Sequence, residues 1–410
     1  MAKNSDRLWI TIGILSILLY PLYFLISLSG INKTIESIGK ETCTKINSPT
    51  GELSYCEDVI LINNIAYASC DPSREKINKV LDYNYYEPNE AIPPGNIWRI
   101  DYTITPPKLT ALTKGLKLDN FHPIGISADD EKGVLLAINL PIEPGFTVPT
   151  IEVFSIQNKN DDNDNDNEPI LVHKKTLQHE NIYNPNALHL INDPQWYSAD
   201  GSTPSFFFSN DHYYQHKVLK LIENTAILPI SNVMFYDARH DQVVPVLQDL
   251  AFANGVSGND SLLFVAETNK LRVKQYKLTL NPLTTDPKEM VQLQLIQKIN
   301  VNMAVDNLDY VPSKNQLVIA GHPKGLDFMK FAFAKDRSDP NLVRASSLVS
   351  LWDLSSPSSP STKENKPNLK TLFSDDGHYY AASSTGALDP HHQKLIISSL
   401  YDNGILVCDA

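Results

Sequence analysis

AVDNLDYV, residues Ala304–Val311, is an apolar stretch interrupted by an acid and an amide. Alanine, valine, leucine and tyrosine surround the polar pair, as in a strand that is buried on both faces. Burying Asp306 beside Asn307 without partners would be strongly unfavourable. The stretch is therefore either an exposed turn or a strand whose side-chain oxygens are needed in the interior.

Six segments of the chain share one plan, and AVDNLDYV begins one of them. Each has a short strand that starts with polar or small residues, then a turn, then a strongly apolar strand. The first strands hold Glu57, Ile124, Asn186, Asn254, Asn307 and Gly386, about 53 to 79 residues apart. Sheet modules that recur in this way are typical of propeller blades, here with longer loops than in a WD40 blade of ~40–45 residues. From spacing alone, a β-sandwich with irregular loops is the alternative.

The chemistry of these positions favours the propeller. Equivalent positions of successive blades converge on the central axis of a propeller. A calcium ion takes roughly six to eight oxygen ligands, among them carboxylates and amide carbonyls. The side chains that would converge are Glu57, Asn186, Asn254, Asp306 and Asn307. The sequence therefore predicts an all-β propeller with a central calcium ion, which makes a buried AVDNLDYV strand possible.

The N-terminus carries a separate signal. Residues 8–31, LWITIGILSILLYPLYFLISLSGI, are uncharged; about 20 apolar residues span a bilayer, whereas the apolar core of a signal peptide has roughly 7–15. We expect a cytoplasmic tail at 1–7, a transmembrane signal anchor at 8–31, a linker at 32–42 and the propeller at 43–410. The bulk of this single-pass type II protein would be lumenal, in the endoplasmic reticulum or secretory pathway, or extracellular. A long, cleaved signal peptide is the alternative.

Four cysteines fit such an oxidising compartment. Four cysteines allow three pairings. Cys56 and Cys70 flank a predicted hairpin that turns at Asn63 and Asn64, so they are candidates for a cross-strand bond. That pairing would leave Cys43 to join Cys408.

Charge and short motifs exclude several classes of protein. The formal net charge of −12 argues against a nucleic acid or an anionic membrane surface as a partner. The sequence has no G-x-S-x-G, H-E-x-x-H, C-x-x-C or P-loop motif, which removes the usual serine hydrolases, zinc enzymes and nucleotide-binding proteins. Asn259 lies in a glycosylation sequon, as does Asn32, which is a weaker candidate because it adjoins the apolar span.

Several short motifs, in order, make the sequence similar to the serum paraoxonase/arylesterase family. They are ED at 57–58, SNDHYY at 209–214, FANG at 252–255, VDN at 305–307, GHPKG at 321–325 and the terminal cysteine at 408. The resemblance spans residues 43–408 and implies a six-bladed β-propeller with calcium in its central tunnel. It also implies a disulfide between Cys43 and Cys408 and a retained hydrophobic leader. The catalytic-calcium ligands that it implies are Glu57, Asn186, Asn254, Asp306 and Asn307.

The sequence departs from the family at two places. The resemblance assigns a second calcium to Asp58 and the carbonyl of Ile126, but Ala187 stands where the family has another acid, so we expect this site to be weak. The family's proton-accepting histidine, in PHGIS, aligns with Ile124 in PIGIS. Its partner histidine aligns with Leu140 in NLP. The histidine dyad of the family is therefore absent.

Two functions fit these features. The favoured one is calcium-dependent hydrolysis of a small ester or lactone, in which the metal polarises the carbonyl and a metal-bound carboxylate, Asp306 or Glu57, activates water. His322 is a weaker catalytic candidate, with packing as its alternative role. The other function is a non-catalytic, membrane-anchored propeller with structural calcium that binds a protein partner or assists assembly; fold alone does not choose. His122, two residues before Ile124, is expected to be a loop histidine.

Overall fold

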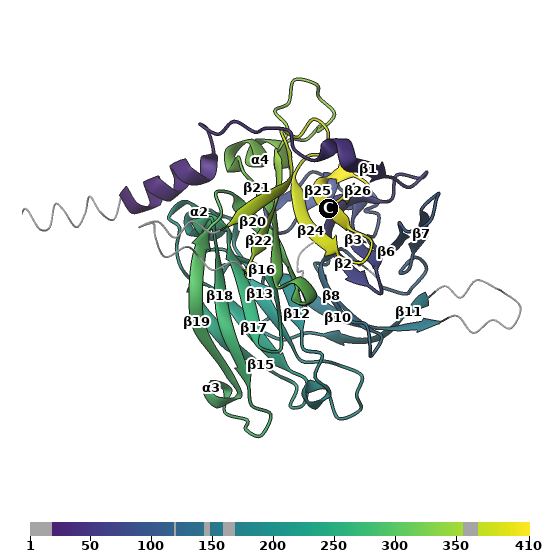
Figure 1. The fold of residues 1–410 in the computed structure, drawn as a ribbon, viewed down its shortest axis with the longest axis vertical. Coiled ribbons are helices and arrows are strands. Elements are labelled where there is room, and N and C mark those ends of the chain that lie inside the picture. Colours follow the sequence, from purple (N-terminus) through teal and green to yellow (C-terminus); the bar gives the residue numbers. More distant parts are fainter. Residues whose placement is uncertain (1–18, 119, 143–147, 159–168, 356–367) are drawn as a thin grey trace, which may run out of the picture.

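The computed structural model describes residues 19–118, 120–142, 148–158, 169–355 and 368–410. Within these ranges most of the regular structure consists of β-strands, which pair as antiparallel sheets (Figure 1). The sheets follow one another around a centre. The protein is therefore all-β and propeller-like, as the sequence predicts.

Four sheets of four strands each lie in the described ranges, and consecutive strands pair in each of them. The first sheet contains β8 (Pro123–Asp129), β9 (Val134–Asn139), β10 (Thr150–Asn158) and β11 (Pro169–Leu177). The second contains β12 (Pro185–Leu190), β13 (Phe206–Asn210), β14 (Ser231–Asp237) and β15 (Gln242–Leu250). The third contains β16 (Ala253–Asn259), β17 (Leu262–Glu267), β18 (Arg272–Leu280) and β19 (Val291–Asn300). The fourth contains β20 (Ala304–Val311), β21 (Gln316–His322), β22 (Ser347–Asp353) and β23 (Leu369–Asp375).

A larger sheet of eight strands joins the two ends of the described chain. One half contains β2 (Ser54–Ile62), β3 (Ile65–Cys70), β6 (Asn96–Asp101) and β7 (Lys108–Ala111). The other half contains β24 (Ser383–Asp389), β25 (Lys394–Asn403), β26 (Ile405–Asp409) and β1 (Cys43–Ile46). Strand β2 pairs with β25 and so links the halves. Because β1 completes the C-terminal half, early and late segments hold each other in place.

Two disulfides lie in this sheet, and one of them fastens the closure. Cys43 of β1 lies opposite Cys408 of β26 and is bonded to it, so the pairing that the family resemblance implies is confirmed. Cys56 of β2 is bonded to Cys70 of β3. The hairpin between them turns at residues 63–64, as expected, with φ of 50° and 60°, the positive values that a two-residue hairpin turn requires.

The first strands of the sheets form a ring. Contacts run from β2 to β8, β12, β16, β20 and β24, and from β24 back to β2. The six positions that the repeat aligns lie one on each of these strands: Glu57, Ile124, Asn186, Asn254, Asn307 and Gly386. Neighbouring strands come very close, because a Cβ atom at Gly125 would lie 2.4 Å from the carbonyl oxygen of Asn186. Five of these positions lie at the irregularity in the pairing of their strand. Gly386 lies beyond the irregularity of β24, and a Cβ atom there would meet Val349 and Val318, so the predicted equivalence fails at Gly386.

The apolar core lies between adjacent sheets, while the ring itself carries buried polar residues. In one cluster, Ile138 and Val153 share a core with Phe206 and Phe208 of the next sheet. The stretch AVDNLDYV is strand β20, in which Asp306 and Asn307 are 6% and 3% exposed. The exposed-turn alternative is therefore wrong, and the interior holds both polar side chains.

Short helices complete the structure. They are α2 (Lys217–Thr225), α3 (Pro287–Met290), α4 (Gly325–Ala332) and the 3₁₀ turns η1 (Lys40–Thr42), η2 (Pro72–Glu75), η3 (Pro194–Trp196), η4 (Thr268–Lys270) and η5 (Pro312–Lys314), and the small strands β4 (Ile77–Asn78) and β5 (Tyr83–Asn84) also pair. Helices α2 and α4 lie toward one end of the molecule and α3 toward the other (Figure 1).

An N-terminal helix, described at residues 19–29, lies beside α4 (Figure 1). A Cβ atom at Gly325 would lie 2.5 Å from the carbonyl oxygen of Leu28, so the two segments touch. Lys33 Nζ then donates to the carbonyl oxygens of Asn302 at 2.7 Å and Pro323 at 2.9 Å. No helix in the described ranges is long and apolar enough to cross a membrane. Residues 8–18 of the predicted anchor lie outside those ranges, so the anchor is not confirmed.

Candidate active site

A cavity of about 330 Å³ lies where the ring meets the covering helices. Its lining includes Glu57 of β2, Asn186 of β12, Asn254 of β16 and Asp306 of β20. Most other residues that line the cavity are apolar. Some of them come from the N-terminal helix, α2 and α4, which cover the ring of strands: Leu25, Leu28, Leu221, Phe328 and Met329. The cavity thus combines a few convergent polar groups with an apolar wall, which is typical of a small-molecule site.

The five predicted calcium ligands lie together, and we call them the oxygen cluster: Glu57, Asn186, Asn254, Asp306 and Asn307. All five are buried. The amide of Asn307 donates to Glu57 Oε1 at 2.8 Å, and that of Asn254 donates to Asp306 Oδ1 at 3.1 Å. Asn186 lines the cavity together with Glu57, Asn254 and Asp306. Residues up to 250 positions apart therefore meet, because each sits on a first strand of the ring.

The oxygen cluster contains more acceptor atoms than nearby donors. Glu57 Oε2 and Asn254 Oδ1 are buried and have no hydrogen-bond partner in the described part of the chain. Burial raises the pKa of Glu57 well above its usual value, and the charges of Asp58 and Asp306 raise it further. A bound cation would supply both oxygens with a partner and oppose this rise in pKa. The donor set therefore fits a hard divalent cation.

Carboxamides are as important as acids in this cluster. No group of three or more His, Cys, Asp or Glu side chains in the described residues is arranged to hold a metal. The cluster instead has two carboxylates and three amides. An amide can turn its oxygen toward a cation, and the hydrogen-bond network decides which of its two atoms faces which neighbour.

Asp58, a predicted ligand of the second calcium, is occupied by protein donors. Its Oδ2 accepts from the Ile126 N–H at 2.9 Å, and its Oδ1 accepts from Thr385 Oγ1 at 3.0 Å. Burial raises the pKa of Asp58 to about 6, although these hydrogen bonds oppose the rise. Ala187 contributes no side-chain oxygen. A weak second calcium site stays a prediction.

Ile124 and Leu140, which replace the family's histidines, both line the cavity. They are buried and belong to the same apolar cluster. Both positions that carry a histidine in the family therefore lie at the cavity, and the part of the cavity wall that they form is apolar.

His322 also lines the cavity, as the family match implies. Its Nε2 lies 3.2 Å from Asp306 Oδ2, and its ring stacks on Phe328 with 3.8 Å between centroids. Its Nδ1 is buried and has no partner in the described ranges. His322 is thus held between α4 and the oxygen cluster, and it fixes one oxygen of Asp306.

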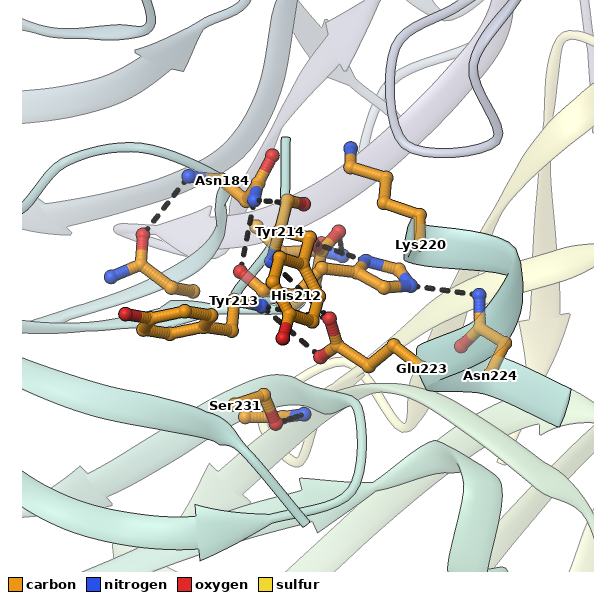
Figure 2. Close-up of polar contacts among 12 residues, drawn as sticks. Asn184, His212, Tyr213, Tyr214, Lys220, Glu223, Asn224 and Ser231 are labelled. Atoms are coloured by element: carbon orange, nitrogen blue, oxygen red, sulfur yellow. Dashed lines mark hydrogen bonds and ion pairs between the residues drawn. The ribbon is translucent and has the colours of Figure 1, made fainter. Parts of the chain in front are cut away.

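Hydrogen bonds connect α2 to the oxygen cluster, and Figure 2 shows the part around His212. Asn186 Nδ2 donates to Asp211 Oδ2 at 3.2 Å, and Asp211 Oδ1 lies 2.7 Å from His212 Nδ1. His212 Nε2 lies 2.8 Å from Asn224 Nδ2 on α2. Glu223 of α2 accepts from the two backbone N–H groups that follow His212. Helix α2 is therefore fixed beside the cavity by polar contacts.

His122 was missed as a site residue by sequence reasoning. It does precede β8 in a loop, as expected, but it is 3% exposed and lines the cavity. Its Nδ1 lies 3.1 Å from Oδ2 of Asp71, which also lines the cavity. The two residues are 51 positions apart, and neither lies in a motif that would have connected them.

Known proteins with esterase and lactonase names are similar to this chain. A family model described as Arylesterase matches residues 86–410. Serum paraoxonase/arylesterase 2 of Homo sapiens is 24% identical over 382 residues, which is 91% of this chain and 90% of that relative. Serum paraoxonase/lactonase 3 of Oryctolagus cuniculus is 23% identical over 312 residues, 75% of each chain. Among solved structures, a chain of a nidogen/laminin complex has a TM-score of 0.44 and 11% identity over 75% of this chain and 82% of that chain, too distant to bear on fold or function.

Proposed function

This chain belongs to the arylesterase family, and from that membership we propose that it hydrolyses small carboxylic esters or lactones with calcium held in the oxygen cluster. Family membership supports ester or lactone hydrolysis at the level of the family. One observation carries the calcium-dependent form: two buried oxygens, Glu57 Oε2 and Asn254 Oδ1, lack partners in the described chain beside the cavity. We further propose a six-bladed propeller whose first and last blades share one sheet.

The residues that would hold calcium are Glu57, Asn186, Asn254, Asp306 and Asn307. Calcium bound there would polarise the carbonyl group of the substrate and stabilise the negative charge that develops on its oxygen. Asp58 has protein donors for both of its oxygens, so the proposal needs no second ion there.

The apolar wall binds the rest of the substrate. Ile124 and Leu140 lie on one part of this wall, and Phe328 and Met329 of α4 on another. Packing of an acyl or aryl group against these side chains removes its apolar surface from water at about 25 cal/mol per Å². The same packing keeps bulk water from the carbonyl, which strengthens electrostatic interactions there.

Asp306 and Glu57 serve this scheme best as ligands. Asp306 Oδ1 accepts from Asn254, and its Oδ2 faces His322. Glu57 Oε1 accepts from Asn307, which leaves Oε2 for the cation. These contacts fix both carboxylates in place, and a separate group would accept the proton of the attacking water more readily.

The location of the protein is part of the proposal. Both disulfides support a lumenal or extracellular compartment. Residues 8–31 are proposed as the anchor of a type II membrane protein. Asn259, the last residue of β16 before the turn to β17, is proposed as a glycosylation site, with Asn32 as a weaker one.

The test is hydrolysis by the purified full-length chain in detergent. An aryl acetate and a five-membered lactone are each offered with excess calcium and with excess chelator. Turnover that requires calcium with either substrate supports the proposal. No turnover with either one, together with a melting temperature that still depends on calcium, favours the non-catalytic, membrane-anchored binding or assembly role instead.

A further inference from the structure

A buried histidine–aspartate pair lies on the cavity wall outside the oxygen cluster. Asp71 directly follows β3, and His122 directly precedes β8. Their side chains are 5% and 4% exposed, and both residues line the cavity. His122 Nδ1 lies 3.1 Å from Asp71 Oδ2 and 3.1 Å from Ser73 Oγ. Both contacts of the ring are therefore made by the same nitrogen.

The neighbours of Nδ1 decide which ring nitrogen carries the proton. Ser73 Oγ donates its hydrogen to Asp71 Oδ1 at 2.6 Å, so its oxygen faces Nδ1 as an acceptor. Burial alone would raise the pKa of Asp71, but its hydrogen bonds to His122 and Ser73 and the charge of Arg74 hold that pKa below its usual value, so Asp71 accepts as a carboxylate. With two acceptors at Nδ1, the proton of the neutral ring lies on Nδ1, and Nε2 keeps its lone pair.

The other atoms of the pair leave Nε2 for a ligand. His122 Nε2 makes no hydrogen bond to any residue in the described ranges. Ser73 is not a candidate nucleophile, because it is fully buried and its hydroxyl group faces Nδ1 of His122 instead of Nε2. Its backbone N–H also donates to Asp71 Oδ1 at 3.0 Å, so Asp71 caps η2 and Ser73 orients the carboxylate.

Arg74 connects this pair to the strand that carries Glu57. Its Nη2 donates to the carbonyl oxygen of Pro123 at 2.9 Å, one residue after His122. Its Nη1 donates to the carbonyl oxygen of Tyr55 at 2.5 Å, two residues before Glu57. The guanidinium group is rigid and planar, so it fixes the two backbone segments relative to each other.

The two other buried histidines of this region are less suited to accept a proton. Both ring nitrogens of His212 are engaged, by Asp211 and Asn224. His322 uses Nε2 toward Asp306, and its Nδ1 is buried. His122 differs from both, because its aspartate holds one nitrogen while the other remains unpaired with the described residues at the cavity wall.

We propose that His122 is the general base of this site and that Asp71 orients it, a role that replaces the histidine missing at Ile124. This inference rests on the proposed hydrolase function. His122 Nε2 takes a proton from water as the water oxygen bonds to the carbonyl carbon. The same proton then passes to the alkoxy or aryloxy oxygen as its bond to that carbon breaks, which yields the acid and the alcohol. No electron acceptor is needed. Asp71 is a positioning residue that stabilises the imidazolium between the two transfers.

The test compares His122→Gln and Asp71→Asn in the full-length, calcium-loaded protein. For His122→Gln we expect kcat to fall roughly 100-fold or more with KM nearly unchanged, since a general base contributes about 10²–10⁴-fold. The decrease in kcat/KM that the wild type shows at low pH should be absent from His122→Gln. Asp71→Asn should lower kcat less and displace the acid limb. His392→Gln removes a histidine that also pairs with an aspartate but lies in an exposed turn, and it should change neither quantity.

A second measurement does not depend on turnover. Diethyl pyrocarbonate acylates unprotonated imidazole, and peptide mapping of the calcium-free protein should find His122 modified and His212 protected. The inference is overturned if His122→Gln keeps wild-type kcat and its acid limb while the wild type is active. It is also overturned if the acid limb is lost in Asp306→Asn alone, or if His122 resists the reagent. A wild type without calcium-dependent turnover overturns the hydrolase function itself, and the inference with it.

Discussion

Glu57 shows how one side chain connects folding with ligand binding. Its raised pKa means that the calcium-free folded protein holds a proton there that the unfolded chain releases. The contribution to stability is fully present below the ordinary value of 4.5 and is lost as pH rises through the higher folded value. Calcium must displace this proton to bind. Protons and calcium therefore compete at Glu57.

The first prediction concerns this competition. Calcium affinity of the wild type should increase as pH rises above the ordinary pKa of 4.5 and through the higher folded pKa of Glu57, because deprotonation of Glu57 frees its ligand oxygens. Glu57→Gln should weaken calcium binding at least roughly tenfold at neutral pH, and the calcium affinity of this variant should change less with pH than that of the wild type. Isothermal titration of chelator-stripped protein measures both, and the exposed Glu131→Gln is the matched control. Equal affinity of Glu57→Gln and wild type would remove Glu57 from the site.

The second prediction concerns the missing dyad. Ile124→His with Leu140→His places imidazoles at two positions that line the cavity. Ester hydrolysis should rise in this double variant, and the same change should restore roughly 10–100-fold of the activity that His122→Gln removes. Both substitutions bury polar groups, so the melting temperature should fall. Steady-state rates on an aryl acetate measure the effect. If the wild type and the double variant are both inactive, the hydrolase proposal fails.

Single residues also mark the limit of sequence reasoning. Asp306 and Asn307 were predictable because two polar residues in an apolar strand need a reason to be buried. His122 and Asp71 gave no such signal. Each lies beside a strand instead of within one, and their contact depends on the η2 turn and on the packing of β3 against β8.

At the level of strands and helices, the repeat predicted the first strands well and the helices not at all. The period of apolar strands identifies β2, β8, β12, β16, β20 and β24, because each blade needs one such strand. Helices α2 and α4 lie in connections between strands, and their stretches of eight or nine residues are too short for a decisive periodic signal. Their docking on the ring sets the apolar wall of the cavity, so that wall was not predictable.

Glu267, at the end of β17, gives the third prediction. It is fully buried, and Arg272 Nε and Lys274 Nζ lie 2.5 Å and 3.1 Å from its Oε2. Burial opposes its ionisation, but these cations hold the pKa of Glu267 below its usual value. Its stabilising effect is therefore present above the ordinary pKa of 4.5 and is lost as pH falls through the lower folded value.

Glu267→Gln should lower the free energy of unfolding near neutral pH, by up to about 3 kcal/mol because Arg272 and Lys274, which lose their partner, are partly exposed. Urea unfolding at neutral and at acid pH measures the loss. The difference in free energy of unfolding between Glu267→Gln and the wild type should be smaller at acid pH, because the wild type itself loses the ion pairs there. A difference below about 1 kcal/mol at neutral pH would contradict the role assigned to this carboxylate.

The whole molecule depends on joining its ends, which gives the fourth prediction. Cys43–Cys408 closes 365 residues and Cys56–Cys70 closes 14. In the chain-entropy description a bond that closes a longer loop stabilises more, about 3 kcal/mol for 15 residues and about 5 kcal/mol for 100. Replacing Cys43 and Cys408 by serine should therefore destabilise more than replacing Cys56 and Cys70.

The shorter bond should matter more for the site. Cys56 and Cys70 directly precede Glu57 and Asp71, so their loss loosens a calcium ligand and the partner of His122 together. Calcium affinity should then fall in Cys56→Ser/Cys70→Ser and stay near wild type in Cys43→Ser/Cys408→Ser. Urea unfolding and calcium titration of both double variants separate the two effects. The reverse order of affinities would contradict this assignment.

The repeated strand modules anticipated the all-β, propeller-like fold of the whole molecule, because closure of a ring follows from repeated modules and joined ends. The position of the N-terminal helix against α4 was not anticipated. It depends on tertiary contacts such as that of Leu28 with Gly325, which no local pattern encodes.

The most direct test of the account is a parallel titration of bound calcium and turnover. Chelator-stripped full-length protein receives calcium in steps, and bound ion and hydrolysis of an aryl acetate are measured in the same samples. We predict that turnover rises with the first equivalent of bound calcium, and that Glu57→Gln moves both curves to higher calcium by the same factor. Turnover that persists in excess chelator, or a site that fills with calcium while no ester or lactone is hydrolysed, would contradict the account.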